Sequence, residues 1–238
     1  MDTNYNKLRA QAKNRIQRFK DASWFKTDAM PFVSVFGVGS LGSYVAFFLS
    51  RMDCKVQVVD SDKLEPVNSS AQFYPYSYCI AEKPKVIALA EFLKDFVQDD
   101  VNIYPMQDRV TNEYVLNSSI VFSCFDNMEA RKILFNKWAS LDNREIFIDL
   151  RANMEEFSVF VVTKGNEQRY LDDFYDDSAI PDLPCSLKST SHCSAMCASI
   201  AIGLFTNYLS NKSTGESIRE LPYSTKISIP ISFYDVQF

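Results

Sequence analysis

Apolar and polar positions alternate along the chain with two periods, one typical of buried strands and the other of helices. Short apolar runs of mainly β-favouring residues lie at 32–36, 54–60, 101–106, 119–125 and 145–150. Between them, helical spacing of apolar residues occurs at 41–52, 83–96, 112–116 and 128–140. Because buried strands that alternate with helices are typical of parallel sheets, the pattern predicts a Rossmann-like, doubly wound α/β fold with right-handed crossovers.

The pattern changes after residue 150. The segment EFSVFVV at 156–162 alternates like a half-exposed strand, which favours antiparallel pairing. An acidic, proline-containing stretch at 170–184 indicates a loop, and a long helix of small residues follows at 191–209. Two prolines in the last part of the chain predict one or two edge strands there.

We therefore expect one α/β domain whose mostly parallel sheet carries a C-terminal antiparallel elaboration. Its parts are an N-terminal helical segment at 1–30, a nucleotide-binding core at 31–150 and the elaboration at 151–238. The residues at 61–78, between the second strand and the next helix, are predicted to form a polar loop.

The first strand runs directly into a glycine-rich turn, in the sequence VSVFGVGSLGSYVAFFLS. Gly37, Gly39 and Gly42 have the spacing G-x-G-x-x-G, and glycine is needed there because a side chain would block backbone amides from a phosphate. The phosphate would rest on the helix that begins near Leu41. The turn predicts nucleotide binding.

An acidic residue at the tip of the next strand supports this reading. Asp60 stands where a carboxylate accepts hydrogen bonds from ribose hydroxyls. Up to this point NAD, FAD and ATP fit the pattern equally well.

Composition narrows the class of protein without identifying it. The chain has 238 residues, of which 47% are hydrophobic, and a formal net charge of -5, which argues against non-specific nucleic-acid binding. We find no signal-peptide core and no apolar run of membrane length. Six cysteines include no C-x-x-C pair and there is one histidine, so a structural zinc site is poorly supplied. We expect a reduced, cytoplasmic protein without membrane or nucleic-acid partners.

The residues after Asp60 separate the nucleotide classes. Asp62, Asn68, Gln72 and Lys85 follow in an order that resembles the adenylating family of ThiF, MoeB and the ubiquitin-activating enzymes. That family's pattern is roughly D-x-D-x-V-x-x-x-N-x-x-R-Q-F, then G-x-x-K-A. The segment VFSCFDNMEARKILF resembles the family's next motif, D-x-V-x-D-x-x-D-N-x-x-x-R. The resemblance covers residues 33–150 well, is weaker up to 209 and does not extend to the last part of the chain.

The resemblance implies a role for each matched residue. Lys85 contacts the phosphates of ATP, Asp126 helps to hold Mg²⁺, and Asp60 binds the ribose. The residues that bind the nucleotide are then Gly37, Gly39, Ser40, Leu41, Gly42, Asp60, Asp62, Asn68, Gln72, Lys85 and Asn127.

Ala71 departs from the family's pattern, because an arginine that contacts the phosphates usually precedes the glutamine. The family also brings an arginine from the N-terminal helix across a dimer interface, and Arg15 and Arg18 are the candidates for it. The missing arginine leaves two readings open, an active enzyme and a nucleotide-binding regulatory subunit. An NAD-linked oxidoreductase, which the glycine turn alone permits, is the third.

Cys185 follows a proline in a loop, just before a Ser/Thr-capped helix. Members of the family that form a thioester carry a nucleophilic cysteine in this general region, and a nearby helix N-terminus favours the thiolate. The alternative is a packed structural cysteine. His192 is a candidate partner or a surface residue, and we expect Cys193 and Cys197, four residues apart, to be packing residues.

The resemblance implies an ATP-dependent adenylyltransferase that activates a carboxylate as an acyl-adenylate. The implied substrate is the C-terminal glycine of a ubiquitin-like or sulfur-carrier protein, with a modified tRNA base as a minor alternative. ATP and Mg²⁺ are the implied ligands and a homodimer the implied assembly.

Overall fold

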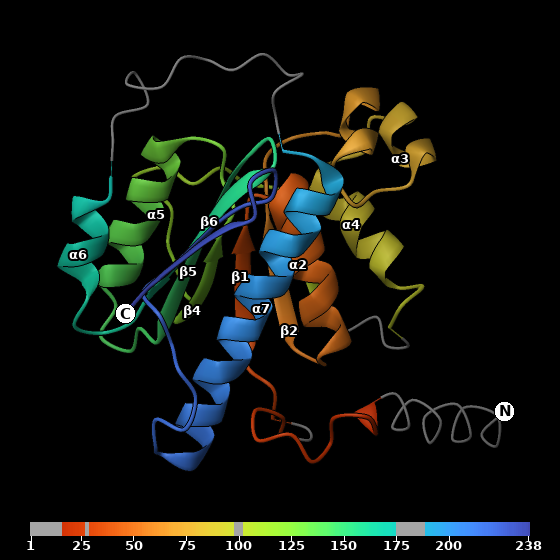
Figure 1. Ribbon diagram of the computed structural model, residues 1–238. Helices are drawn as coiled ribbons and strands as arrows, with labels where there is room; N and C mark the ends of the chain where they lie inside the picture. Colours follow the sequence, from red (N-terminus) through yellow and green to blue (C-terminus); the bar gives the residue numbers. More distant parts are fainter. Residues whose placement is uncertain (1–15, 27–28, 98–101, 175–188) are drawn as a thin grey trace, which may run out of the picture.

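The computed structural model describes residues 16–26, 29–97, 102–174 and 189–238 (Figure 1). Within these residues, one sheet lies between helices. Its strands are β1 (Phe32–Phe36), β2 (Lys55–Val59), β3 (Ile103–Met106), β4 (Ile120–Ser123), β5 (Ile146–Asn153), β6 (Glu156–Val162), β7 (Ser224–Ser228) and β8 (Phe233–Gln237). The helices are α2 (Ser40–Arg51), η2 (Pro66–Ser70), α3 (Tyr76–Ile80), α4 (Lys85–Leu93), α5 (Met128–Ala139), α6 (Glu167–Asp172) and α7 (Ser191–Thr214).

The strands lie in the order β3-β2-β1-β4-β5-β6-β7-β8. Neighbours from β3 to β5 are parallel, and those from β5 to β8 are antiparallel. The prediction of a mostly parallel sheet with an antiparallel C-terminal elaboration is confirmed. Winding reverses at β1, since β2 and β3 lie on one side of it and β4 and β5 on the other. In such folds a ligand binds outside the carboxyl ends of the strands at this point.

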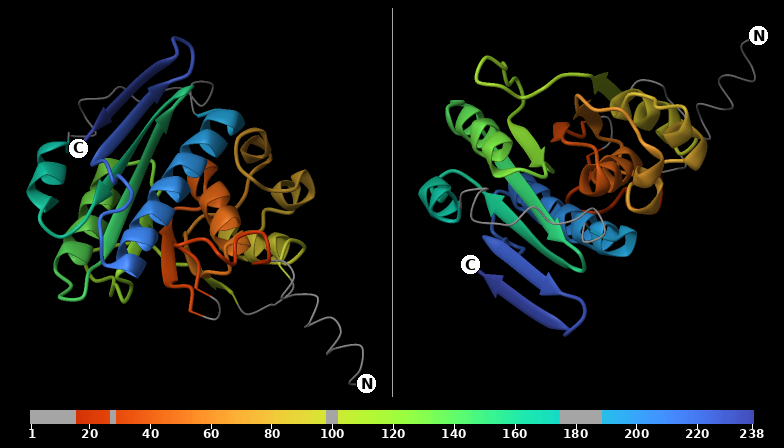
Figure 2. Two further views of the ribbon diagram at one scale, coloured as in Figure 1. Left: turned by 60° about the horizontal axis from the view of Figure 1, so that its bottom comes forward. Right: turned by 90° about the horizontal axis from the view of Figure 1, so that it is seen from above.

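Helices cover both faces of the sheet (Figure 2). On one face α2, α4 and α7 share a core with β1 residues such as Val33 and Val35. On the other face α5 and α6 pack with Phe36 and Phe147. Because both faces are buried, the central strands are mostly apolar, as the sequence pattern indicates.

Among the described residues, α7 is the one helix that could cross a membrane by length and composition alone. It has 24 residues, and half of its most apolar stretch is buried inside the fold. The small side chains of Cys197, Ala198 and Ala201 are fully buried, and the helix packs against α2, β5 and β6. This is the position of a core helix.

A buried carboxylate joins α5 to β5. Asp149 is fully buried and accepts hydrogen bonds from Arg131 and from Arg151 Nε, the latter at 2.6 Å. Arg131 also donates to the carbonyls of Phe125 and, at 2.9 Å, Leu150. Burial alone would raise the pKa of Asp149, but the two guanidinium groups hold it below its ordinary value. These contacts fix the chain where β4 ends and α5 begins.

Two predicted elements differ in the structure. The segment 112–116, predicted to be a short helix, contains a turn and no helix. Thr111 Oγ1 donates to a carboxylate oxygen of Glu113 at 2.8 Å and accepts from its backbone N–H at 3.3 Å, and such local bonds compete with a helix. The predicted loop at 61–78 contains η2 and the start of α3. Pro66 at the start of η2 and the Asn68 side chain, which accepts from Glu65 N–H at 2.8 Å, stabilise that turn.

Three further predictions were wrong. The described part of the N-terminal segment, from residue 16 to 26, forms turns and not a continuous helix. The strand β6 is mostly buried and not half-exposed, because β5 and β7 flank it and α7 packs on it. The stretch predicted as a loop from 170 begins inside α6, where Tyr170 is fully buried among aromatic rings.

The substitution Asp149→Asn is expected to destabilise the fold by about 3–5 kcal/mol, because it leaves buried guanidinium charge uncompensated. The folded pKa of Asp149 lies below the unfolded value of about 3.9, so its contribution is present above that pH and is lost as the pH falls through the folded pKa. Urea unfolding at several pH values measures both effects. The variant should lose less stability on acidification than the native protein.

The matched control is Asp142→Asn, which changes an exposed acid and is expected to alter stability by no more than about 0.5 kcal/mol. Equal stability of the Asp149→Asn variant and this control would contradict the assignment.

Candidate functional site

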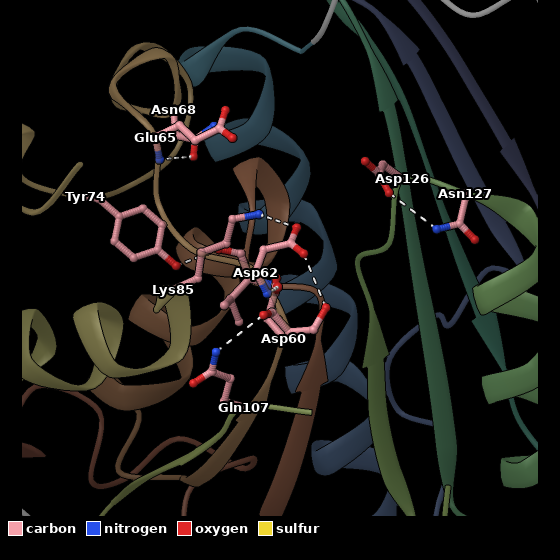
Figure 3. Close-up of polar contacts among 11 residues, drawn as sticks. Asp60, Asp62, Glu65, Asn68, Tyr74, Lys85, Gln107, Asp126 and Asn127 are labelled. Carbon is pink, nitrogen blue, oxygen red and sulfur yellow. Dashed lines mark hydrogen bonds and ion pairs between the residues drawn. The ribbon is translucent and has the colours of Figure 1, made fainter. Parts of the chain in front are cut away.

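A cavity of about 980 Å³ lies at the carboxyl ends of the central strands. The residues predicted to bind nucleotide supply much of its lining from the ends of β1, β2 and β4. Figure 3 shows Asp60, Asp62 and Lys85 together on one side and Asp126 and Asn127 on the other. The predicted residues that line it are Gly37, Gly39, Ser40, Asp60, Asp62, Asn68, Gln72, Lys85, Asp126 and Asn127.

The turn between β1 and α2 is built on very close backbone contact. A Cβ atom placed on Gly42 would lie 1.9 Å from the Gly37 carbonyl oxygen, so only glycine allows α2 to start this close to β1. Gly39 has an ordinary negative φ of -76°, and a Cβ there would meet nothing nearer than 3.9 Å. The packing of the described residues therefore leaves room for a side chain at 39, and this open space faces the cavity at the N-terminus of α2.

Asp60 fastens the tip of β2 to this turn. Its Oδ2 accepts from Val38 N–H and its Oδ1 from Asp62 N–H, both at 2.8 Å. Burial raises the pKa of Asp60 above its ordinary value, although the charge of Lys85 and the two N–H groups oppose the shift. The Tyr74 hydroxyl donates to the Val38 carbonyl at 2.6 Å and closes the same cluster.

Asp62 and Lys85 form an ion pair inside the lining. Lys85 Nζ lies 2.9 Å from Asp62 Oδ2, and its own backbone N–H donates to the Asp62 carbonyl at 2.9 Å. Burial alone would raise the pKa of Asp62. The hydrogen bond and charge of Lys85, with smaller effects of Ser61 and Arg109, lower it overall. Asp62 therefore holds the lysine to which the family resemblance gives a phosphate-binding role.

Gln72 has a buried oxygen with no hydrogen-bond partner among the described residues, its Oε1. The side chain lines the cavity, so a bound ligand is the natural partner for its amide. Phe73 N–H donates to Ser43 Oγ at 3.0 Å, which holds this segment against α2. Ala71 precedes Gln72 and does not line the cavity.

Asp126 and Asn127 face this group from the tip of β4. Asn127 caps α5, since its Oδ1 accepts from Ala130 N–H at 2.8 Å. The Asp126 side chain is exposed, with a long contact of 3.5 Å to Asn127 Nδ2. No group of three His, Cys, Asp or Glu among the described residues could hold a metal by itself. A single carboxylate beside a phosphate site nevertheless fits Mg²⁺, which takes few protein ligands besides phosphate oxygens and water.

Several predicted site residues lie elsewhere. Leu41 and Gly42 are buried beneath the turn and do not line the cavity. Arg18 is exposed and is not part of the lining. Arg15 and Cys185 lie outside the described residues.

The prediction that Cys193 and Cys197 are packing residues is confirmed, since both are buried in the core. The other cysteines in the described part of the chain, at 54, 79 and 124, are buried as well. His192 is exposed, with its Nε2 2.9 Å from Glu155 Oε1.

Arg109 lines the cavity but was not among the predicted site residues. It follows β3 by three residues, at the same edge of the sheet as Asp60. The signal was its place just after the third predicted strand, since the carboxyl ends of parallel strands meet at one edge of the sheet.

Solved structures with this fold include two forms of the enzyme MccB. E. coli MccB with ATP aligns with a TM-score of 0.63 at 13% identity, over 87% of this chain and 63% of that one. The microcin biosynthetic enzyme MccB in complex with N-formylated MccA aligns with a TM-score of 0.66 at 14% identity, over 87% and 64%. PaaA aligns with a TM-score of 0.65 at 17% identity, over 87% and 63%.

At these identities the likeness shows the fold alone, and the chain spans about 63% of the length of MccB and PaaA. No curated protein matches the sequence significantly. The sequence does match the ThiF family over residues 13–221, which is most of its length. The chain therefore belongs to the ThiF family.

Proposed function

We propose that the protein is an ATP-dependent adenylyltransferase. The proposal rests on one observation. The glycine turn, Asp60 and Lys85 line one side of a single cavity, and Asp126 faces them from the other side. To bind a redox dinucleotide, the protein would need only the glycine turn and Asp60. Lys85 and Asp126 add a cation and a carboxylate on opposite sides, which suits a triphosphate that reacts. The structure of E. coli MccB with ATP supports the choice of nucleotide.

In the proposed reaction a carboxylate oxygen of the substrate attacks the α-phosphorus of ATP. The bond from that phosphorus to the bridging oxygen breaks, its electron pair leaves with pyrophosphate, and the product is an acyl-adenylate. Because negative charge gathers on the phosphate oxygens, fixed positive groups lower the barrier most. Lys85 supplies an ammonium group, and the first N–H groups of α2 supply the positive end of a helix dipole.

Asp126 is the residue that would hold Mg²⁺. The ion would neutralise part of the phosphate charge when bound. Asn127, by capping α5, holds the start of that helix and so keeps Asp126 at the strand tip.

The substrate that the family resemblance supports is the C-terminal glycine of a ubiquitin-like or sulfur-carrier protein. MccB, which has this fold, has been solved in complex with N-formylated MccA, so a protein with this fold binds a further molecule. We further infer a cytoplasmic homodimer in which Arg15 or Arg18 of one subunit reaches the phosphates of the other. A thioester on Cys185 is a further step of the same proposal.

Ala71 favours a second candidate function, that of a nucleotide-binding regulatory subunit. Losing a phosphate-contacting arginine weakens catalysis more than it weakens nucleotide binding, because charge grows in the transition state. ATP binding without pyrophosphate exchange would identify this case.

The substitution Lys85→Met is expected to lower ATP–pyrophosphate exchange by about hundredfold to thousandfold, since it removes a charge that faces the phosphates. Exchange is measured with radiolabelled pyrophosphate and a panel of small proteins that end in Gly-Gly. Asp126→Asn is expected to lower it as well. The control is Lys55→Met, which removes an exposed lysine at the opposite end of β2 and should leave exchange unchanged. If both site variants exchange at the native rate, the site assignment is wrong.

The proposed reaction requires a free carboxylate at the C-terminus of the substrate. A carrier protein or peptide that supports exchange should lose this ability when its C-terminal carboxylate is converted to an amide, because the attacking oxygen anion is then absent. The same assay measures it, with the free acid as control. Equal exchange with the acid and the amide would rule out C-terminal activation.

A further inference from the structure

The lining of the cavity is poor in positive charge. Among the described residues it holds seven carboxylates and three cations. A nucleoside triphosphate would add more negative charge to this surface, so each cation in the lining matters for binding. The three are Lys63, Lys85 and Arg109.

These three cations are not equally placed. Lys85 is already paired with Asp62, at 2.9 Å. Lys63 is exposed in the strand-like bridge that its backbone forms with Pro84. Arg109 carries the one guanidinium in the described lining, and this planar group binds two phosphate oxygens at once where an ammonium binds as a point charge.

The backbone on both sides of Arg109 is held in place. Before it, Gln107 Nε2 lies 3.5 Å from the Ser61 carbonyl, and Asp108 Oδ1 accepts the Arg109 N–H at 2.7 Å. After it, Val110 is buried in the core. The residue therefore lies directly before a buried anchor and next to the tip of β2, while its side chain is exposed at the cavity.

We propose that Arg109 binds the phosphate chain of the nucleotide and supplies, from the segment after β3, the guanidinium that Ala71 does not provide. Asp62, which pairs with Lys85, belongs to the same cavity lining as Arg109. The effect of Arg109 on the pKa of Asp62 agrees with this placement. The assignment rests on the proposed function, because it requires that ATP occupy this cavity.

Isothermal titration calorimetry of the full chain with ATP, AMP and adenosine tests the assignment. Arg109→Gln is expected to weaken ATP binding by about tenfold to hundredfold, the loss of a charge-assisted pair, and to leave adenosine binding unchanged within about twofold. Arg109→Lys should bind ATP with intermediate affinity, because it keeps the charge and loses the fork. Arg51→Gln is the matched control, at the far end of α2 from the glycine turn, and should bind as the native protein does.

The outcomes separate this assignment from the proposed function. If Arg109→Gln binds ATP with native affinity, Arg109 is not a phosphate ligand, and the nucleotide site stands. Equal losses for ATP and adenosine, with an unchanged melting temperature, would place Arg109 on the nucleoside and overturn the proposal. A selective loss in Lys63→Gln instead would give the role to that lysine. If the native protein binds no ATP, the proposed function fails and the Arg109 assignment falls with it.

Discussion

The contact between Gly42 and the Gly37 carbonyl is the constraint on which the cavity depends. It brings the first turn of α2 against the end of β1, where the winding of the sheet reverses. The surrounding groups are then fastened to the turn between them: Asp60 accepts from Val38 N–H, and Tyr74 donates to the Val38 carbonyl. A side chain at 42 would move the helix away and separate these groups, so the geometry of the site follows from the absence of one methyl group.

Two carboxylates two residues apart have opposite environments in this site. Asp60 is enclosed, and burial raises its pKa, whereas the pairing of Asp62 with Lys85 lowers the pKa of that acid despite its burial. Asp60 anchors the backbone of the turn and also lines the cavity. Asp62 is stabilised as an anion by its ion pair with Lys85. Aspartate therefore has a structural role at position 60 and an electrostatic role at position 62.

Much of the fold could be predicted because periodicity and local chemistry agree. The bounds of β1 match the prediction, since an apolar run ends at a glycine turn, and α5 begins where Asn127 caps it. Asp60 and Asp126 reach one cavity because the ends of parallel strands meet at one edge, and Lys85, the first residue of α4, joins them through its contacts with Asp62. The segment after β3 could not be predicted in the same way. It has no period, and the contacts that place Arg109 come from Gln107 and from core packing, which only the folded chain supplies.

The cluster of Arg131, Asp149 and Arg151 has a consequence for how this sequence can change over time. Arg131 and Asp149 are buried and Arg151 is largely enclosed, so a substitution that removes one charge leaves its partners without compensation. An apolar replacement of the whole set is physically acceptable, but the intermediate sequences are not. We expect the residues at these three positions either to stay unchanged among homologous chains or to change together. Substitutions at one position should therefore be correlated with substitutions at the other two.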